Sequence, residues 1–521
     1  MADHTQPEAA TDTGAAGELY LAGTAAAAEP LCVDLDGTLV KSDTLVDSVL
    51  VLARQSPRCL LALPGWLAGG KAAFKQKISS HAPLDVARLP YNQELLDYLR
   101  EQHAQGREIY LATGADAALA ERVAAYLGIF SGVLASDGAV NLTGRNKLAA
   151  FQSRFAQGFS YIGNATPDIH LLTACLHPMV ANPHRGLLRS LRAAGVQPIR
   201  TFRDAAHPAK AWLKVVRLHQ WAKNTLIFLP LLLAHVRSPG PMAAALLAFL
   251  SFGLAASATY ILNDLLDLEA DRHHPRKRRR PFAAGDVSPF AGIATIGVFV
   301  VLSFVAAVLV PHALGGLSPH VAPETRWRFI EWLGVYAVST TAYSLWLKRM
   351  VLVDVIVLSG LYTIRILAGA AATAVPISPW LAAFSIFFFL SLAFVKRFSE
   401  LESLRLRTEA DGPPGAAAAA GVRGRGYVLS DLEQLRSFGT ASGYASVVVF
   451  ALYIGNLSSA ELYRHNGRLW LLVPVLLLWL SRLWLLASRD DLHEDPVVYA
   501  ITDKRSLLLG AAVVGIVLSA V

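Results

Sequence analysis

Long apolar runs recur along the chain from about residue 213 to its end. A helix that crosses the hydrocarbon layer needs about 20 predominantly apolar residues, and nine segments approach that length. They cover residues 222–237, 241–266, 288–310, 327–346, 351–374, 379–396, 439–456, 467–487 and 505–521. The pattern predicts an all-α, nine-helix transmembrane bundle over residues 210–521.

The first part of the chain has a different pattern, in which short apolar runs alternate with helical segments. Such alternation favours a parallel sheet covered by helices, so residues 28–205 are expected to form a soluble α/β domain. Residues 43–95 lie between the first two strand motifs and are expected to form a small helical cap. Residues 1–27 are rich in Ala, Thr, Gly and acids, which is typical of disorder.

Composition and charge agree with a membrane protein. The chain is 54% apolar and only 17% charged, which excludes an ordinary soluble enzyme. Its net charge of +8 comes largely from loops after alternate spans, and the positive-inside rule explains that asymmetry with a cytoplasmic N-terminus. We therefore expect a multi-pass protein of the inner (cytoplasmic) membrane, with the lipid bilayer as its partner and no nucleic-acid partner.

Polar side chains gather at the cytoplasmic end of the second span. Asn263, Asp267 and Asp271 recur every four residues, and Asp264 lies beside them, so all four share one side of a helix. Clustered carboxylates repel one another unless a cation lies between them, and oxygen ligands of this kind suit Mg²⁺ shared with a diphosphate. The alternative is a solvated helix end, where acids are harmless.

A basic run, His273 to Pro281, follows the acids directly. Part of it serves as an orientation signal for the membrane. Because Arg and Lys side chains also bind phosphate oxygens, we expect Lys277, Arg278 or Arg280 to contact a substrate.

The motif Asn263-Asp264-x-x-Asp267-x-x-x-Asp271 resembles that of the UbiA superfamily of membrane prenyltransferases, over roughly residues 210–521. The resemblance implies a nine-helix bundle with a central cavity open to the cytoplasm. It also implies that these four residues hold Mg²⁺ and the donor's pyrophosphate.

The fifth span departs from the common family pattern of a second acidic pair. It begins with Asp354, but Leu358 stands four residues on, followed by Tyr362 and Arg365 along the same helix stripe. An arginine inside a span is costly and normally faces a partner or a cavity. A structural ion pair inside the bundle is the alternative.

This pattern resembles the branch that contains polyprenyl-phosphate phosphoribosyltransferases, as do Gln220-Trp221-x-Lys223-Asn224 and Tyr343-Ser344-x-x-x-Lys348. The resemblance implies 5-phosphoribosyl 1-diphosphate as the donor and a polyprenyl phosphate as the acceptor. Lys223, Lys348 and Arg365 are the cations expected to hold the lipid phosphate. The expected substrate-binding set on these segments is Lys223, Asn224, Tyr343, Lys348, Asp354, Tyr362 and Arg365.

The N-terminal domain carries four motifs at the ends of predicted strands: Asp34-Leu35-Asp36-Gly37-Thr38, Thr113-Gly114, Lys147 and Gly163-Asn164-x-x-x-Asp168. In this order they resemble the haloacid dehalogenase (HAD) superfamily of phosphatases. The resemblance implies that Asp34 attacks phosphorus, Asp36 is the general acid/base, Thr113 binds a phosphoryl oxygen and Lys147 offsets charge. Asp34, Asn164 and Asp168 would hold Mg²⁺.

Asn164 departs from the usual aspartate and removes one charge from the metal site, which leaves open a working phosphatase or a domain of reduced activity. The preferred hypothesis is a transferase whose phosphorylated lipid-sugar product is dephosphorylated by the fused domain. Prenyl transfer from a polyprenyl diphosphate to an aromatic or other acceptor is the alternative. A transporter or scaffold with a vestigial enzyme face is a third reading.

Overall fold

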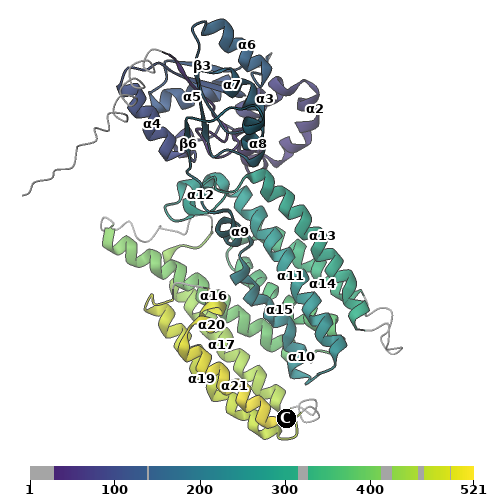
Figure 1. The fold of residues 1–521 in the computed structure, drawn as a ribbon. Helices are drawn as coiled ribbons and strands as arrows, with labels where there is room; N and C mark the ends of the chain where they lie inside the picture. Colours follow the sequence, from purple (N-terminus) through teal and green to yellow (C-terminus); the bar gives the residue numbers. More distant parts are fainter. Residues whose placement is uncertain (1–28, 138–139, 315–326, 412–424, 456–462, 493–494) are drawn as a thin grey trace, which may run out of the picture. The chain divides into compact units, whose positions relative to one another are not determined.

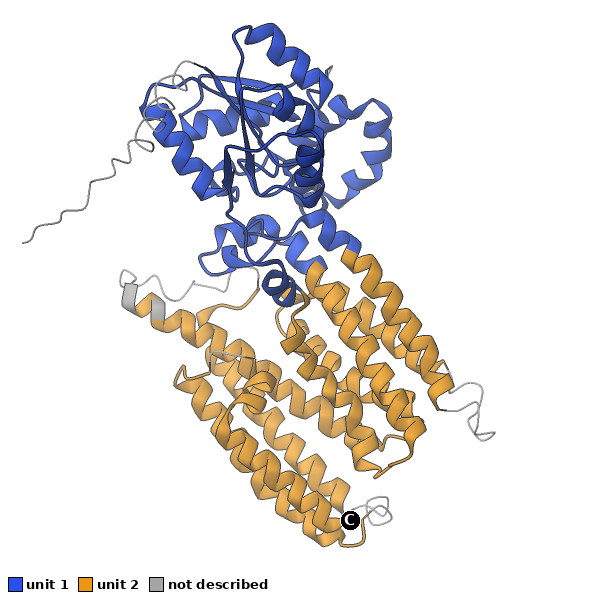
Figure 2. Ribbon diagram, in the orientation of Figure 1, with its two compact units in different colours: residues 1–215, 262–294 blue, residues 216–261, 295–521 orange. Residues whose placement is uncertain are grey.

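The computed structural model describes residues 29–137, 140–314, 327–411, 425–455, 463–492 and 495–521. The expected disordered segment 1–27 lies outside the described residues. Contacts divide the chain into two compact units, coloured separately in Figure 2. Unit 1 comprises residues 1–215 and 262–294, and unit 2 comprises residues 216–261 and 295–521.

Unit 1 is built on a six-stranded, fully parallel sheet in the order β3-β2-β1-β4-β5-β6. The expected α/β parallel-sheet domain is confirmed. The strands are β1 (Leu31–Val33), β2 (Ile109–Asp116), β3 (Gly132–Ser136), β4 (Ser160–Gly163), β5 (His177–Ala181) and β6 (Arg200–Phe202). The central strand β1 is an unbroken apolar run because helices cover both faces of a parallel sheet.

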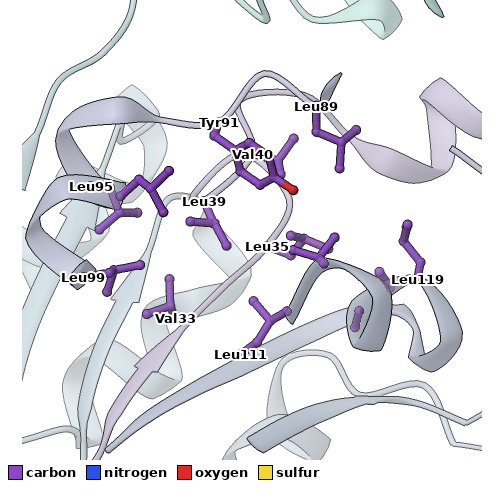
Figure 3. Close-up of a cluster of buried hydrophobic side chains, with 14 of the residues drawn as sticks. Val33, Leu35, Leu39, Val40, Leu89, Tyr91, Leu95, Leu99, Leu111 and Leu119 are labelled. Carbon is purple, nitrogen blue, oxygen red and sulfur yellow. The ribbon is translucent and has the colours of Figure 1, made fainter. Parts of the chain in front are cut away.

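Two apolar clusters lie on the two faces of this sheet. Successive strand residues point to opposite faces, so Val33 joins one cluster and Cys32 the other. Figure 3 shows Val33 and Leu35 packed with Leu111 of β2 and with Leu95 and Leu99. The sheet therefore lies between two helical layers.

The helices of unit 1 connect these strands (Figure 1). Between β1 and β2 lie α1 (Thr44–Gln55), α2 (Leu63–Ala68), α3 (Lys71–His81) and α4 (Gln93–Ala104). The others are α5 (Ala117–Leu127), α6 (Arg145–Arg154), α7 (Ile169–Ala174), α8 (Arg185–Ala193), α9 (Pro208–Val216) and α12 (Leu268–His273). Asp43 caps α1 by accepting hydrogen bonds from the N–H groups of Leu45 and Val46, which satisfies two orphan donors.

Unit 2 is helical and belongs to a multi-pass membrane protein. Its helices are α10 (Leu229–Leu233), α11 (Pro239–Leu266, shared with unit 1), α13 (Pro289–Ala313), α14 (Arg328–Leu345), α15 (Val353–Thr373), α16 (Pro379–Asp411), α17 (Leu432–Ile454), α19 (Leu472–Ser488), α20 (Pro496–Thr502) and α21 (Lys504–Ala520). Six helices in the described part of the chain are long and apolar enough to cross a membrane: α11, α13, α15, α16, α17 and α19, the last two with their flanking turns.

The predicted count of nine spans is not confirmed. Segment 222–237 is a 3-10 turn, η4 (Leu218–Phe228), followed by the short α10, because polar residues and Pro230 interrupt the apolar run. Helix α14 carries Arg328 and Glu331 near its start, and α21 has 17 residues. These three segments correspond to the three spans that the structure does not support by length and apolarity.

The turn η4 is held tightly within unit 2, against α15 and α11. A Cβ at Gly369 of α15 would lie 2.1 Å from the carbonyl oxygen of Ile227, so the absence of a side chain lets the two backbones touch. The Trp221 indole N–H donates to the Ser257 hydroxyl at 2.9 Å. These contacts fix the positions of Lys223 and Asn224, which lie on the same turn.

Candidate active sites

The carboxyl end of strand β1 carries two half-buried aspartates, Asp34 and Asp36, that line a cavity of about 570 Å³. Lys147 of α6 donates to Asp34 Oδ1 at 2.7 Å and to the Tyr161 hydroxyl at 2.9 Å. Asp36 Oδ1 accepts from the N–H of Thr44 at 2.8 Å. The parallel topology thus brings together residues more than 100 positions apart, at the edge where such sheets bind ligands.

Burial shifts the protonation of both aspartates. It raises the pKa of Asp34 to about 6, with Lys147 opposing the rise and Asp168 adding to it. Burial raises the pKa of Asp36 to about 7, with Asp43 adding to the rise and the Thr44 N–H opposing it. A carboxyl group that keeps a proton near neutral pH can serve as a general acid.

The third predicted motif shapes the same cavity. Asp168 Oδ2 accepts from the N–H groups of Asn164 and Ala165, at 3.1 and 3.0 Å, and Oδ1 accepts from Tyr161 at 3.0 Å. Gly37 has φ +74°, and a Cβ there would lie 2.0 Å from the Asn164 amide nitrogen. The carboxylate of Asp168 accepts three hydrogen bonds that hold this loop, and the loop presents Asn164 to the first motif.

Thr113 is not a lining residue but directly precedes one, Gly114, and an unexpected lysine completes the wall. Thr113 is fully buried, and its hydroxyl accepts from the N–H of Ala115 at 3.0 Å. Lys75 of α3 donates to the Gly114 carbonyl at 2.6 Å and to Asn141 Oδ1 at 2.9 Å, and it lines the cavity. Burial lowers the pKa of Lys75. Sequence reasoning missed Lys75 because a lysine in the helical insert carries no motif.

The acidic motif does not lie on one helix as expected, because α11 ends at Leu266 and Asp271 lies on α12. Its acids contact the basic segment that follows. Arg280 donates to Asp264 Oδ1 at 2.9 Å and to Asp271 Oδ2 at 2.7 Å. Arg54 of α1 lies 3.4 Å from Asp267. A guanidinium therefore bridges two carboxylates that would otherwise repel each other.

The fit of this motif to Mg²⁺ rests on its donor chemistry. Asp264 and Asp271 are buried and both face the same cation. Within the described residues, no group of three or more His, Cys, Asp or Glu side chains is arranged to hold a metal ion. Lys277 and Arg278 lie in an exposed 3-10 turn beyond the motif, η5 (Lys277–Arg279), and Asn263 lies one helical turn before Asp267 and accepts its N–H through the backbone carbonyl.

Arg272, next to Asp271, is buried. Its guanidinium lies 2.8 Å from Asp47 Oδ2 and donates to the Ser42 hydroxyl and to the Ala283 carbonyl. The positive-inside pattern counts Arg272 among the loop cations, but the structure uses it as a buried ion pair between α12 and α1. Asp47 has no exposed side-chain surface.

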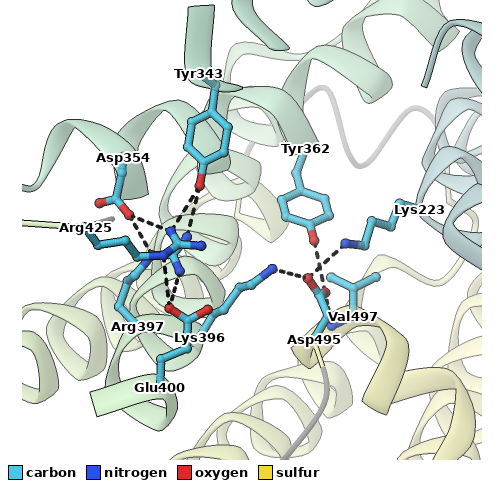
Figure 4. Close-up of polar contacts among 10 residues, drawn as sticks. All are labelled: Lys223, Tyr343, Asp354, Tyr362, Lys396, Arg397, Glu400, Arg425, Asp495 and Val497. Carbon is cyan, nitrogen blue, oxygen red and sulfur yellow. Dashed lines mark hydrogen bonds and ion pairs between the residues drawn. The ribbon is translucent and has the colours of Figure 1, made fainter. Parts of the chain in front are cut away.

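In unit 2, Asp354 is the centre of one polar network (Figure 4). It accepts from Arg397 Nε at 2.6 Å and from the Tyr427 hydroxyl, and Arg425 lies 3.6 Å away. Arg397 also donates to the Tyr343 hydroxyl at 3.0 Å. Two predicted residues, Asp354 and Tyr343, thus meet through an arginine that sequence reasoning did not select.

Asp495 is the centre of a second network (Figure 4). Lys223 and Lys396 each donate to Asp495 Oδ2 at 2.9 Å, and the Tyr362 hydroxyl donates to Oδ1 at 3.1 Å. Burial opposes ionisation of Asp495, but Lys396 and Lys223 hold its pKa well below the usual range. Asp495 and Lys396 were missed, since their partners lie 99 or more residues away in the chain.

Arg365 belongs to a third group of contacts. Its Nε donates to Asn224 Oδ1 at 2.8 Å, and a terminal nitrogen donates to the Tyr336 hydroxyl at 3.3 Å. Arg365 and Asp354 share a helix stripe but lie about 16 Å apart along α15. The predicted stripe is therefore divided between separate networks. Lys348, half-buried, lies in the turn after α14.

An apolar cavity of about 430 Å³ adjoins the Asp495 network. Its lining includes Leu226, Phe388, Trp479 and Val497. Val497 donates its N–H to Asp495, and another lining residue, Phe389, stacks on Tyr362. Buried cations and a large apolar space therefore lie side by side in unit 2.

Residues 225–508, more than half of the chain, match the family model described as the UbiA prenyltransferase family. The match, the membrane helices and the buried ionic networks define a multi-pass membrane transferase. The chain belongs to the UbiA prenyltransferase family.

This chain is similar to known proteins from several organisms. The protein y4nM of Sinorhizobium fredii is 36% identical over 488 residues, 93% of this chain and 89% of that protein, so the similarity extends across both units. Decaprenyl-phosphate phosphoribosyltransferase of Mycobacterium tuberculosis (strain H37Rv) is 36% identical over 194 residues, 36% of this chain and 59% of that protein. The structure of a UbiA homologue from Archaeoglobus fulgidus bound to GPP and Mg²⁺ is 14% identical, with 60% of this chain and 99% of that one covered and a TM-score of 0.43.

Proposed function

We propose that the UbiA-family region, residues 225–508, transfers 5-phosphoribose from 5-phosphoribosyl 1-diphosphate to a polyprenyl phosphate. The N-terminal domain, which we assign to the HAD superfamily, then removes the 5-phosphate from the lipid-linked product. Both sites work on the cytoplasmic side of the inner membrane, as the distribution of basic residues favours.

The observation that carries the proposal is the bridge that Arg280 makes between Asp264 and Asp271. Acids and an arginine side by side are what a metal-bound diphosphate requires, because the acids hold Mg²⁺ and the arginine binds phosphate oxygens. Asn263, Asp264, Asp267 and Asp271 would hold the metal, whose charge stabilises the departing pyrophosphate. Arg280 and its neighbours Lys277 and Arg278 would bind the phosphates.

The acceptor's phosphate would bind at Lys223 and Lys396. These two lysines point at one carboxylate, Asp495, so the site already accommodates a buried anion. The adjoining apolar cavity suits a polyprenyl chain, since its lining is aliphatic and aromatic. Tyr362, Arg365 and Asn224 would fix the orientation of the groups that meet there.

The fused domain would hydrolyse the phosphomonoester in two steps. The Asp34 carboxylate forms a bond to phosphorus while the bond from phosphorus to the sugar oxygen breaks, and Asp36 gives that oxygen its proton. Water then attacks the aspartyl phosphate with Asp36 as the base. Thr113 would bind a phosphoryl oxygen, Lys147 offsets negative charge, and Asp34, Asn164 and Asp168 would hold Mg²⁺.

Prenyl transfer from a polyprenyl diphosphate to another acceptor is the second candidate, favoured by the description of the matching family as prenyltransferases. The two candidates differ in the group that carries the diphosphate. In one it is a phosphorylated sugar, and in the other it is the lipid itself.

The test supplies purified full chain with 5-phosphoribosyl 1-diphosphate labelled in the sugar, polyprenyl phosphate and Mg²⁺. We expect the label to enter the lipid-soluble fraction. Asp267→Asn should reduce the rate by at least about 100-fold, since it removes one charge from the metal site, whereas Asp491→Asn in the C-terminal loop should leave it unchanged. Transfer from a labelled prenyl diphosphate, with no transfer from the sugar donor, would replace the proposal with the second candidate.

A further inference from the structure

The cavity at Asp34 and Asp36 has a neighbour in unit 1, a more open pocket of about 550 Å³. Lys41, Ala205 and Asp286 line both. Lys41 follows the first aspartate motif, and Asp286 belongs to the segment after Arg280. The two spaces are therefore adjoining compartments, with Lys41 at their boundary.

The second pocket is rich in cations from three parts of the chain. Lys41, Arg203, Arg278 and Arg279 line it, against two carboxylates, Asp204 and Asp286. Both carboxylates lie near Lys41, at 3.4 and 3.6 Å. Arg203, Arg278 and Arg279 are exposed, and across the described residues no hydrogen bond or ion pair engages their guanidinium groups.

The wall that carries these groups is tightly folded. Gly285 has φ +72°, and a Cβ there would lie 2.7 Å from Lys41 Cβ. The N–H groups of Asp286 and Val287 both donate to the Pro281 carbonyl, and the Phe282 side chain is buried. Lys41 is fixed in turn, because its N–H donates to the Pro90 carbonyl. The backbone therefore fixes the distance between the second pocket and the cavity at Asp34 and Asp36.

We propose that the second pocket binds a second phosphate of the phosphatase substrate, with Arg203 and Arg279 as specificity residues. The substrate class is a sugar with a phosphomonoester at one end, bound at Asp34, and a phosphate or phosphodiester at the other, bound by the arginines. The inference rests on the proposed phosphatase activity. It deepens that activity, because a lipid-linked 5-phosphoribosyl phosphate has both groups on one sugar.

Exposed arginines beside a membrane segment need no ligand, since the positive-inside rule accounts for them. Arg203 is outside that rule, because it follows strand β6 and not a membrane span. It nevertheless lines the same pocket as Arg278 and Arg279. Arg203 and Arg279 line one pocket from different segments of the chain, and each guanidinium group can bind two phosphate oxygens in a fork.

The experiment measures phosphate release by purified full chain from three probes in Mg²⁺: ribose 5-phosphate, ribose 1,5-bisphosphate, and the farnesyl ester of 5-phosphoribosyl 1-phosphate. We expect a KM at least roughly tenfold lower for the two probes with a second phosphate, since each charge-assisted bond contributes about one power of ten. Arg203→Gln with Arg279→Gln should remove that advantage and change the KM for ribose 5-phosphate far less. Arg276→Gln, an exposed arginine on the same segment outside the pocket, is the matched control.

Equilibrium dialysis measures the binding of labelled ribose 1,5-bisphosphate without hydrolysis. It therefore tests the second phosphate site separately from the proposed phosphatase activity. If wild type hydrolyses no probe but binds the bisphosphate more tightly than the double variant, the phosphatase fails and the second site stands. If hydrolysis occurs with equal KM for all probes, the second site is overturned and the phosphatase stands. An advantage for the free bisphosphate alone would identify a soluble substrate rather than a lipid-linked one. Arg203→Gln alone, outside the transferase segment, must reproduce part of the effect, or the inference is wrong.

Discussion

At the scale of single residues, Asp495 explains how the buried Lys223 and the half-buried Lys396 coexist beside an apolar cavity. Burying an unpaired ammonium group costs several kcal/mol, and Asp495 offsets the charge of both Lys223 and Lys396. A lipid phosphate monoester carries a negative charge of about 1.5–2 at neutral pH and has more acceptor oxygens than a carboxylate. Under the proposed function, the acceptor would bind the two lysines only by displacing the carboxylate, so the two anions would compete for one place.

The first prediction follows from this competition. Lys396→Gln should raise the KM for polyprenyl phosphate about tenfold or more, because a hydrogen bond to a charged group contributes about 1.5–3 kcal/mol. The KM for the sugar donor should change little. Steady-state transfer assays that vary each substrate in turn measure both constants.

Arg482→Gln is the matched control for Lys396→Gln, since Arg482 pairs with Asp503 at 2.7 Å and has no bond to the Asp495 network. An equal rise in the KM of both substrates, or an effect of Arg482→Gln as large as that of Lys396→Gln, would contradict the assignment of Lys396 to the acceptor.

At the scale of elements, the ion pair of Arg272 with Asp47 joins α12 to α1. Removing one partner of a buried pair leaves an uncompensated charge and typically costs about 3–5 kcal/mol. Arg272→Met should lower the free energy of unfolding of unit 1 by about that amount. Pulse proteolysis of the full chain in detergent, with cleavage followed in the N-terminal domain, measures the loss.

The second partner supplies the check. Asp47→Leu combined with Arg272→Met should recover most of the stability, because two apolar side chains leave no charge behind. Arg100→Gln breaks an exposed pair with Asp97 and should change the free energy by less than about 1 kcal/mol. Similar losses in the single and double variants would mean that packing, and not charge, holds α12 to α1.

The sequence predicts some of these elements and site residues but not others. The parallel sheet is predictable because strands such as β1 are short apolar runs that end in motif residues. Lys147 meets Asp34 at that edge of the sheet, but it does so from helix α6 and not from the end of a strand. The broken turn η4 was read as a span, since apolar content conceals a local break at Pro230. Lys75, Lys396 and Asp495 could not be found, because each gains its role from partners that only the fold brings near.

At the scale of the whole molecule, fusion would make the proposed second reaction intramolecular. A tether replaces the bulk concentration of an intermediate by an effective concentration on the order of millimolar. A phosphorylated lipid sugar made by one site would then reach the other before it diffuses away. The benefit is kinetic, and it requires that both activities reside on one chain.

The last prediction tests that coupling. Asp34→Asn should accumulate lipid-linked sugar that retains its 5-phosphate, because it removes the nucleophile and leaves the transferase motif intact. A mixture of Asp34→Asn and Asp267→Asn chains in separate micelles contains both activities but no tether. Thin-layer chromatography of labelled lipids over time should show the phosphorylated species rising and then falling in the mixture, while wild type shows little of it at any time.

Equal time courses for the mixture and wild type would mean that the intermediate equilibrates freely between chains. Unchanged products in Asp34→Asn alone would show that the N-terminal domain acts on something else.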